Sequence, residues 1–320
     1  MYTVGIDLGG TNIAIGLCDK DYNIIDRAKT KTKPERGADA ITEDMCRLTE
    51  ELLSRNRLTV KDIEYVGIAT PGIVNVTEGV VEKCCNLPFR DYPLIKRFSQ
   101  LLPGVRVHIA NDANAAALAE ALIGAARGTR TSVMLTLGTG VGSGIIIDGK
   151  IFSGGLNYAG AELGHMVIKA DGRQCACGRR GCLECYCSAV ALTTMTKEKM
   201  KELSMKDIPS KLFEVASEDG KIGARTPFKA MRRGDVHAAA IVDKYIRYLG
   251  LALANIINVF QPEVISIGGG VSNEGAALID PLREVADTEQ YTRDNEVRTR
   301  IYAAKLGTDA GIVGAAGLGR

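Results

Sequence analysis

TVGIDLGGTNIAIGLCDKDYNIIDRAKTK, residues 3–31, is the stretch from which the fold can be argued. Its apolar runs are interrupted by short groups of Gly, Asn, Thr and Asp, which are typical turn residues. The pattern predicts three consecutive strands over residues 3–8, 13–18 and 23–31, joined by turns at 9–11 and 19–21. Because so few residues join these strands, we expect them to form an antiparallel meander.

A second stretch, VMLTLGTGVGSGIIIDGKIF at residues 133–152, repeats this order of strand, Gly turn, strand, Asp turn and strand. A shift of 129 residues superposes Val4 on Val133, Leu8 on Leu137, Gly9 on Gly138 and Asp19 on Asp148. We interpret the repeat as an internal duplication. The sequence therefore predicts an α/β protein with two related halves.

The remaining pattern supports this fold class. Apolar periodicity predicts further strands and helices between and after the two meanders. We expect strands over residues 65–69, 105–109 and 264–267, and helices over 38–57, 93–102, 114–126, 188–204, 236–260 and 309–318.

Composition excludes several classes of protein. The chain has 320 residues and a formal net charge of +2, from 40 basic and 38 acidic side chains. A nucleic-acid or membrane-surface protein would be expected to carry a basic stripe, so we expect neither partner. The longest nearly apolar stretch, residues 249–260, contains Asn255 and Asn258 and is shorter than the roughly 20 residues that a bilayer requires. Without a recognisable targeting segment, we expect a cytoplasmic protein.

Glycine is enriched, with 36 residues, and clusters directly after three apolar strands. Such turns can be ordinary hairpin turns, or they can bring backbone N–H groups close to phosphate oxygens. No GxxxxGK[ST] motif is present, and Ser143 stands where GxGxxG would require its last glycine. Three clusters together favour phosphate binding. They comprise Gly9 and Gly10; Gly138, Gly140, Gly142 and Gly144; and Gly268, Gly269 and Gly270.

Two carboxylates follow predicted strands and are candidates for chemistry. Asp7 precedes the first Gly turn, where it could hold Mg²⁺ through water. Asp112 begins an Ala-rich helix, where it could accept a proton from an attacking hydroxyl. The alternative is that each only caps a turn. With a pKa near the reference value of about 3.9, Asp112 would be a weak base.

Five of the nine cysteines lie between Cys175 and Cys187, which indicates metal binding rather than disulfides. Cys175, Cys177 and Cys182 are separated by two glycines that allow a tight fold, and His165 lies ten residues upstream of Cys175. One His and three Cys would fill a closed, structural Zn²⁺ site. Reduced thiols without metal are the alternative. Cys185 and Cys187 could be core residues or alternative ligands.

Glu162 and Glu184 lie beside this metal loop. They could form ion pairs with Arg173, Arg179 or Arg180, or they could recognise substrate hydroxyls. If His165 binds Zn²⁺ through one ring nitrogen, the other nitrogen is free to meet a ligand.

The motifs together resemble the repressor, open-reading-frame and kinase (ROK) family of sugar kinases. They are residues 7–12 (DLGGTN), Asn111–Asp112, Glu162-x-Gly-His165, and the Cys motif from Cys175 through Glu184 to Ser188. The resemblance implies an actin-like, ribonuclease-H-like ATPase fold with two domains around a cleft. We expect a small domain of residues 1–112 plus 306–320, and a large domain of 113–305 carrying the zinc loop 165–188.

The resemblance also implies roles for individual residues. The family transfers phosphate from MgATP to a hexose hydroxyl, and Asp112 would be the general base. Sugar contacts would come from Gly72, Asn86, Asn111, Asp112, Glu162, His165 and Glu184. ATP and Mg²⁺ contacts would come from Asp7, Gly9, Gly10, Thr11, Asn12, Thr136, Gly138, Thr139, Gly140, Gly268, Gly269 and Gly270. Structural Zn²⁺ would be held by His165, Cys175, Cys177 and Cys182.

Glucose is the first candidate acceptor, because residues 86–93 resemble the sugar-side loop of bacterial glucokinases. Phe89, however, stands where Trp is often expected, so N-acetylglucosamine, N-acetylmannosamine, mannose and fructose stay open. The alternatives of another class are a repressor, a non-catalytic sugar-sensing regulator and a chaperone-type ATPase. A repressor would need a DNA-binding segment ahead of Asp7, which we do not expect. The resemblance further implies a homo-oligomer, either a dimer or a tetramer.

Overall fold

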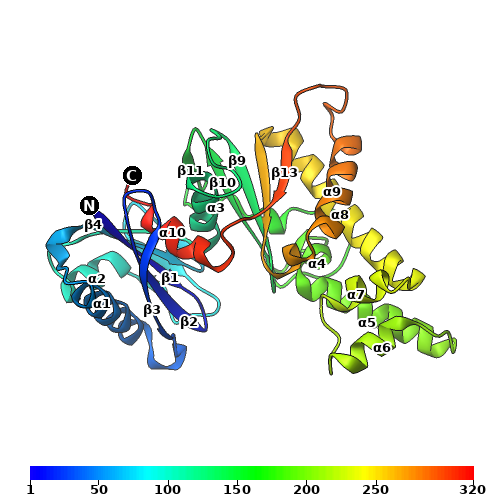
Figure 1. The fold of residues 1–320 in the computed structure, drawn as a ribbon, viewed down its shortest axis with the longest axis horizontal. Coiled ribbons are helices and arrows are strands. Elements are labelled where there is room, and N and C mark those ends of the chain that lie inside the picture. The colour runs from blue at the N-terminus through cyan, green and yellow to red at the C-terminus, as the bar shows by residue number, and fades with distance from the viewer. The chain divides into compact units, whose positions relative to one another are not determined.

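The structure is a computed structural model that describes residues 1–320, and the chain folds into two compact units (Figure 1). The first unit comprises Met1–Met134, Gly144–Ala161 and Lys305–Arg320, and the second comprises Leu135–Ser143 and Glu162–Ala304. The predicted domain boundary at residue 112 falls inside the first unit, because the helix that begins there packs against the C-terminal helix. The two domains expected from the sequence stay a prediction.

The first unit contains a five-stranded sheet with the order β3-β2-β1-β4-β8. Strand β1 pairs antiparallel with β2 and parallel with β4. The strands are β1 (Tyr2–Leu8), β2 (Asn12–Cys18), β3 (Ile24–Lys31), β4 (Ile63–Thr70) and β8 (Arg106–Asn111), and the helices are α1 (Ala38–Arg55), α2 (Leu94–Leu101), α3 (Asp112–Leu122) and α10 (Ala310–Ala316).

A second five-stranded sheet has the order β11-β10-β9-β12-β13. It repeats the first sheet: a three-stranded meander of consecutive strands, followed by two later strands in chain order. The predicted repeat is therefore confirmed in the topology. Its strands are β9 (Ser132–Leu137), β10 (Val141–Ile147), β11 (Lys150–Phe152), β12 (Val264–Gly268) and β13 (Arg300–Ala303).

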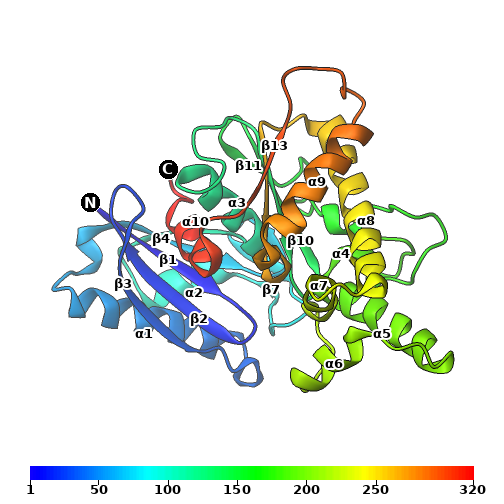
Figure 2. The same cartoon turned by 45° about the vertical axis from the view of Figure 1, so that its right-hand side comes forward.

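The second unit carries most of the helices. Figure 2 shows the two long helices α8 and α9 side by side. The helices are α4 (Glu184–Cys187), α5 (Ala189–Met205), α6 (Lys211–Glu218), α7 (Thr226–Arg232), α8 (Val236–Phe260) and α9 (Ala276–Glu289). The predicted helix over 236–260 is confirmed to the residue, whereas α6, α7 and α9 were not predicted.

A small third sheet in the first unit was also not predicted. It has the order β5-β6-β7, with β5 (Ile73–Asn75), β6 (Val80–Lys83) and β7 (Arg90–Tyr92). Strands of three or four residues are too short to show a clear alternation of apolar and polar side chains.

The two faces of the first sheet are packed differently. On one face, Val4 and Ile6 share a core cluster with Ile41 of α1. On the other face, α10 lies directly on the strands, and a Cβ added at Gly5 would come within 2.0 Å of the Ile312 carbonyl oxygen. A Cβ at Gly67 would likewise come within 1.8 Å of a backbone oxygen of α10. Glycine is required here because helix and sheet backbones touch.

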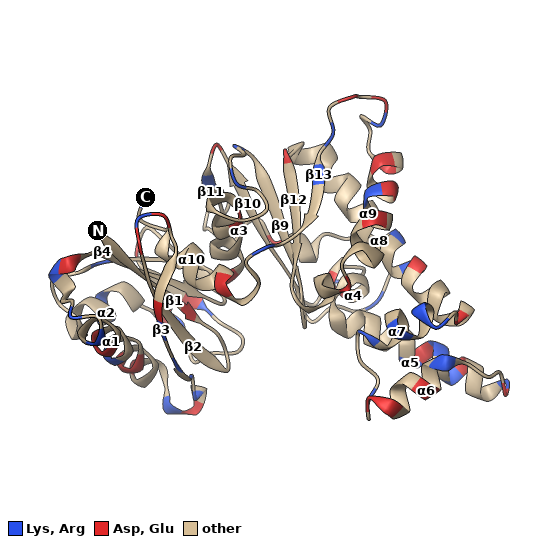
Figure 3. Cartoon of the chain, in the orientation of Figure 1, with Lys and Arg blue, Asp and Glu red and all other residues tan.

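Charged side chains of both signs alternate along the outer helices. Figure 3 shows acidic and basic positions next to one another on α1 and α9. On α1, Arg47 pairs with both Asp44 and Glu51. No helix of the structure is both long and apolar enough to cross a membrane.

Candidate functional site

In the first unit, the predicted Gly turn lies between β1 and β2 and is closed by one backbone and one side-chain hydrogen bond. Gly9 N donates to Asn12 O at 2.9 Å, and the Thr32 hydroxyl donates to Gly9 O at 2.6 Å. Gly10 faces the side chain of Asn86, since a Cβ added at Gly10 would lie 2.9 Å from Asn86 Nδ2. The structure thus brings a predicted phosphate turn and a predicted sugar residue together.

Asp7 lies near the end of β1, paired with Ala14 of β2 and Ala69 of β4. Burial raises its pKa from 3.8 to about 6, the negative charge of Asp112 adds to the rise, and Lys29 opposes it. A buried carboxylate near a second carboxylate favours either a proton or a bound cation. This environment fits the predicted Mg²⁺ role.

Asp112 is the first residue of α3, and its Oδ1 accepts a hydrogen bond from Ala113 N at 2.8 Å. The residue as a whole is exposed, but burial of its carboxyl among protein atoms removes hydration and raises the pKa of this group above the ordinary value of 3.8. The expected pKa of Asp112, near the reference value, is therefore too low. A raised pKa makes Asp112 a stronger base.

Asn111 is the N-cap of α3. Its Oδ1 accepts from Ala113 N at 2.9 Å and from Asn114 N at 3.3 Å, and its Nδ2 donates to Gly72 O at 3.1 Å. Gly72 has φ of 101°, a conformation that favours glycine. The structure brings Gly72 and Asn111 together, but the amide of Asn111 already serves the helix and the turn.

The loop around Asn86 is fixed by buried contacts. Cys84 Sγ donates to Asn86 Oδ1 at 2.9 Å. Phe89 is only 2% exposed, and its ring lies 5.1 Å from that of Tyr92. Within the first unit, Phe89 therefore packs in the core rather than presenting an open surface.

In the second unit, the Gly turns after β9 and β12 meet. Gly138 N donates to Gly140 O at 3.0 Å, and Gly138 O accepts from Ala189 N at 2.8 Å. Gly269 has φ of 82°, and a Cβ there would lie 2.5 Å from Leu137 O. The predicted turn is shorter than expected, because β10 already begins at Val141.

Glu184 connects these turns to the cysteine cluster. Its Oε2 accepts from Val141 N at 3.0 Å, and its Oε1 accepts from Cys175 Sγ at 3.9 Å. A Cβ at Gly140 would lie 2.3 Å from Glu184 Oε2, so only glycine allows this approach. Glu184 is thus held by a backbone N–H rather than by the arginines considered as its alternative partners.

Those arginines are engaged elsewhere. Arg173 pairs with Glu198 at 2.5 Å, Arg179 Nη1 donates to His165 O at 3.4 Å, and Arg180 contacts Gln174. Glu162 precedes the short 3₁₀ helix Leu163–His165, and its carbonyl oxygen accepts from His165 N at 3.0 Å.

The predicted metal ligands converge. The ligand atoms of His165, Cys175, Cys177 and Cys182 all lie within 4.8 Å of one another. Cys175 Sγ lies 3.7 Å from His165 Nδ1, and Cys177 Sγ lies 3.7 Å from Cys182 Sγ. A tetrahedral ion with Zn–S bonds of about 2.3 Å would hold its ligands about 3.8 Å apart. The geometry therefore fits Zn²⁺.

The chemistry of the cluster also fits a cation. Burial and the neighbouring thiols raise the pKa of Cys182 to about 12, while the backbone N–H of Arg179 lowers the pKa of Cys177. Several thiolates this close repel one another unless a cation neutralises them. Because Nδ1 of His165 faces the thiols, its Nε2 stays available to another ligand.

Cys185 and Cys187 do not belong to this group of four. Cys187 is fully buried, and Cys185 Sγ donates to Gln174 O at 3.5 Å. The placement of Cys187 favours the core alternative, whereas Cys185 is half-buried and its thiol lies beside that of Cys175.

Sequence reasoning missed Gly311 of α10, which lies against Asp7. A Cβ at Gly311 would be 2.4 Å from Asp7 Cγ. A glycine inside a helix is a weak signal of close backbone approach, and only the structure shows what it approaches.

Comparison with known proteins places these features in one family. A profile of the ROK family matches residues 3–320. A glucokinase from Thermotoga maritima is 38% identical over 98% of this chain and 96% of its own length. The crystal structure of a ROK family glucokinase from Streptomyces griseus in complex with glucose and AMPPNP has a TM-score of 0.80 at 33% identity and covers 99% of both chains. A xylose repressor from Caldicellulosiruptor bescii is 29% identical over 90% of this chain, but over only 70% of its own length.

Proposed function

This chain belongs to the ROK family, with its actin-like ATPase fold, and we propose that it transfers the γ-phosphoryl group of ATP to a hexose hydroxyl, with glucose as acceptor and glucose 6-phosphate as product. The observation that carries the proposal is that Asp112 lies close enough to Asp7, two residues before the Gly9–Gly10 turn, for its charge to raise the pKa of Asp7. A base and a phosphate site are the two parts that phosphoryl transfer requires.

In the proposed reaction, Asp112 accepts the proton of the sugar hydroxyl as the new O–P bond forms. The bond between the γ-phosphorus and the β–γ bridging oxygen breaks, and ADP leaves. The raised pKa of Asp112 makes this carboxylate a better proton acceptor than an ordinary aspartate. The hydrogen bond from Ala113 N to its Oδ1 fixes the carboxylate at the start of α3.

Backbone N–H groups would bind the phosphates. We assign this role to the turns of Gly9–Thr11 and Gly138–Gly140, with Gly268–Gly270 near the nucleoside. Asp7 would hold Mg²⁺, which neutralises charge on the phosphates when bound. Zn²⁺, held by His165 and the three cysteines, would stiffen the loop that carries Glu162, His165 and Glu184 toward the sugar.

The acceptor is tested by measuring ADP release with glucose, N-acetylglucosamine, N-acetylmannosamine, mannose and fructose. We expect glucose to give the highest kcat/KM. A higher value for an N-acetylhexosamine would reject glucose. No ADP release with any sugar, together with sugar binding, would favour the sugar-sensing alternative.

The base is tested with Asp112→Asn. We expect turnover to fall at least about 100-fold, which is the contribution typical of general-base catalysis, while sugar binding persists. Asp148→Asn, at an exposed pair with Arg130, is the matched control and should retain native turnover. Native turnover in Asp112→Asn would remove Asp112 from this role.

We also propose that the chain forms a homodimer or homotetramer, as expected from the family resemblance. Light scattering coupled to size-exclusion chromatography tests this. A mass of 34.2 kDa across micromolar concentrations would reject it.

A further inference from the structure

Cys84 directly follows strand β6, and the proposed reaction gives its thiol no role. The residue is half-buried, and its backbone N–H donates to Phe89 O at 3.2 Å, which closes the short loop of residues 84–89. Because Phe89 is buried in the core, the loop is anchored in the fold at both of its ends. Within this loop, Cys84 Sγ donates to Asn86 Oδ1 at 2.9 Å.

The hydrogen bond from Cys84 decides which atom of the Asn86 amide faces the first Gly turn. An asparagine amide has an acceptor oxygen on one side and a donor NH₂ on the other. Since the thiol holds Oδ1, Nδ2 faces Gly10, and a Cβ added at Gly10 would lie 2.9 Å from Nδ2 but 3.5 Å from Cγ. The exposed Asn86 side chain therefore presents hydrogen-bond donors beside the turn.

The thiol of Cys84 keeps the proton that this contact needs. Burial raises its pKa above the ordinary value of 9.0, although the backbone N–H groups of Asn86 and Leu87 oppose the rise. The negative charge of Asp112 adds to the rise, so the thiol also lies near the proposed base. At neutral pH Cys84 is therefore a neutral S–H donor rather than a reactive thiolate.

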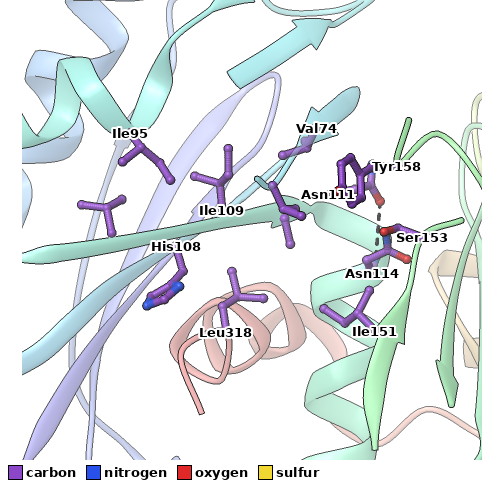
Figure 4. A pocket seen from close by; sticks show the side chains of 13 residues that line it. Val74, Ile95, His108, Ile109, Asn111, Asn114, Ile151, Ser153, Tyr158 and Leu318 are labelled. Atoms are coloured by element: carbon purple, nitrogen blue, oxygen red, sulfur yellow. Dashed lines mark hydrogen bonds between the residues drawn. The ribbon is translucent and has the colours of Figure 1, made fainter. Parts of the chain in front are cut away.

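The backbone of Cys84 packs against the turn that binds Asn111. A Cβ added at Gly72 would lie 3.0 Å from Cys84 Cα, and Gly72 O accepts from Asn111 Nδ2 at 3.1 Å. Figure 4 shows Asn111, at the end of β8, and Val74 of β5, the strand that follows this turn, along the wall of one cavity. These contacts fix Cys84 relative to the start of α3, where Asp112 stands.

We propose that Cys84 is a positioning residue for the sugar: its thiol holds the Asn86 amide so that Nδ2 donates to the oxygen of a sugar hydroxyl. Without the S–H donor, the amide is free to turn its oxygen toward the substrate instead. The sugar contact rests on the proposed kinase function, whereas the contact between the thiol and the amide does not.

Sugar affinity tests this role without requiring turnover. The ligand for calorimetric titration is glucose, N-acetylglucosamine, N-acetylmannosamine, mannose or fructose, whichever the native protein binds most tightly. We expect Cys84→Ala to raise the dissociation constant about three- to tenfold, which is the effect of losing one hydrogen bond. Cys84→Ser keeps a donor at this position and should stay within about twofold of the native protein.

Cys85→Ala, at the adjacent exposed thiol, is the matched control and should bind the sugar with native affinity. Native affinity in Cys84→Ala, or an equal loss in Cys84→Ala and Cys84→Ser, overturns the positioning role.

Steady-state kinetics separates the sugar from the nucleotide. In Cys84→Ala the KM for the sugar should rise about three- to tenfold, while the KM for ATP stays native. A rise in the KM for ATP alone would overturn the sugar contact, because the amide would then serve a phosphate oxygen.

Raman spectroscopy of the S–H stretching band reads the contact between the thiol and the amide directly, whether or not the chain is a kinase. The native spectrum minus that of Cys84→Ala isolates one thiol among the nine cysteines. Donation weakens the S–H bond, so the same difference taken in an Asn86→Ala background should show this band at a higher frequency. A band that does not move overturns the contact. If no sugar bound, the proposed function and the sugar contact would both be rejected, and the Raman band would still decide what Cys84 holds.

Discussion

At the scale of single residues, the carboxylate of Asp7 lies against the backbone of Gly311. Its neighbour Gly311 belongs to a helix that touches the sheet through glycine, so the Cα of Gly311 comes directly against the carboxylate. We infer that the C-terminal helix fixes where Asp7 stands, although Gly311 itself has no group that could take part in chemistry.

Gly311→Ala should therefore damage turnover without unfolding the protein. The new Cβ would lie 2.4 Å from Asp7 Cγ, so the carboxylate must shift by about 1 Å. A shift of that size costs about 100-fold in rate. Because Ala is a better helix former than Gly, the Tm should fall little. We expect kcat to fall and the KM for Mg²⁺ to rise, with unchanged sugar binding.

Gly223→Ala is the matched control, since nothing lies within 4 Å of the Cβ it adds. It should keep native kinetics and a native requirement for Mg²⁺. If Gly311→Ala also kept both, the contact would not position Asp7.

The raised pKa of Asp7 predicts a pH-dependent stability in the absence of Mg²⁺. Between 3.8 and about 6, the folded protein retains a proton that the unfolded chain has lost, so the free energy of unfolding falls as the pH rises. The fall across this window is about 3 kcal/mol. Asp7→Asn should thus be more stable than the native protein at pH 8, by up to about 3 kcal/mol, and equal to it at pH 4.

Urea unfolding in EDTA at the two pH values measures this difference. Asp62→Asn is a control of opposite sign, because the backbone N–H and hydroxyl of Thr59 lower the pKa of the exposed Asp62. It should be less stable than the native protein at pH 8. An Asp7→Asn variant that is less stable than the native protein at pH 8 would contradict the conclusion that burying the ionised Asp7 carboxylate destabilises the fold.

At the scale of elements, one side chain fixes each end of α3. Asn111 caps its start, and Glu120 holds its last turn. Glu120 is fully buried, yet its carboxylate accepts from Lys305 N and Leu306 N at 2.9 Å each and from Ala125 N at 2.6 Å. Three backbone N–H groups thus bind one buried carboxyl group. This links α3 to the segment that leads into α10.

Glu120→Gln should destabilise the protein even though the shape is kept. An amide has one acceptor oxygen, so its NH₂ must face at least one backbone N–H, and that donor stays unpaired. The free energy of unfolding in urea should fall by about 1–3 kcal/mol. Glu51→Gln, at an exposed pair with Arg47, should change it by less than about 1 kcal/mol. Equal effects in both variants would contradict the role of Glu120.

The same elements show what could be read from the sequence. The meanders and α8 were predicted because their apolar patterns extend over many residues without interruption. Strands β5, β6 and β7 were missed because three or four residues are too few to show a repeating pattern of apolar side chains. The Cys motif was predicted by spacing alone and its ligands converge. The contact between Gly311 and Asp7 could not be predicted, because it depends on how α10 packs against β1.

At the scale of the whole molecule, the two units differ in how they are held together. The first unit packs α1 and α10 on opposite faces of a sheet. The second unit contains the long segment of residues 166–183, which has no helix or strand and only two isolated bridges, between Val167 and Cys182 and between Gln174 and Arg180. Such a segment depends on its cross-link, which here is the proposed Zn²⁺.

Removal of the metal should therefore destabilise the metal loop before it destabilises the rest of the chain. Hydrogen exchange measured by mass spectrometry, with and without a chelator, follows each unit in the intact chain. We expect faster exchange in residues 162–188, because metal loss removes the cross-link between His165, Cys175, Cys177 and Cys182. Peptides from β1 and β4 should keep their native protection. Cys85→Ser, which removes an exposed thiol of the first unit, should exchange like the native protein. Uniform loss of protection across both units would show instead that the metal loop and the first sheet unfold together.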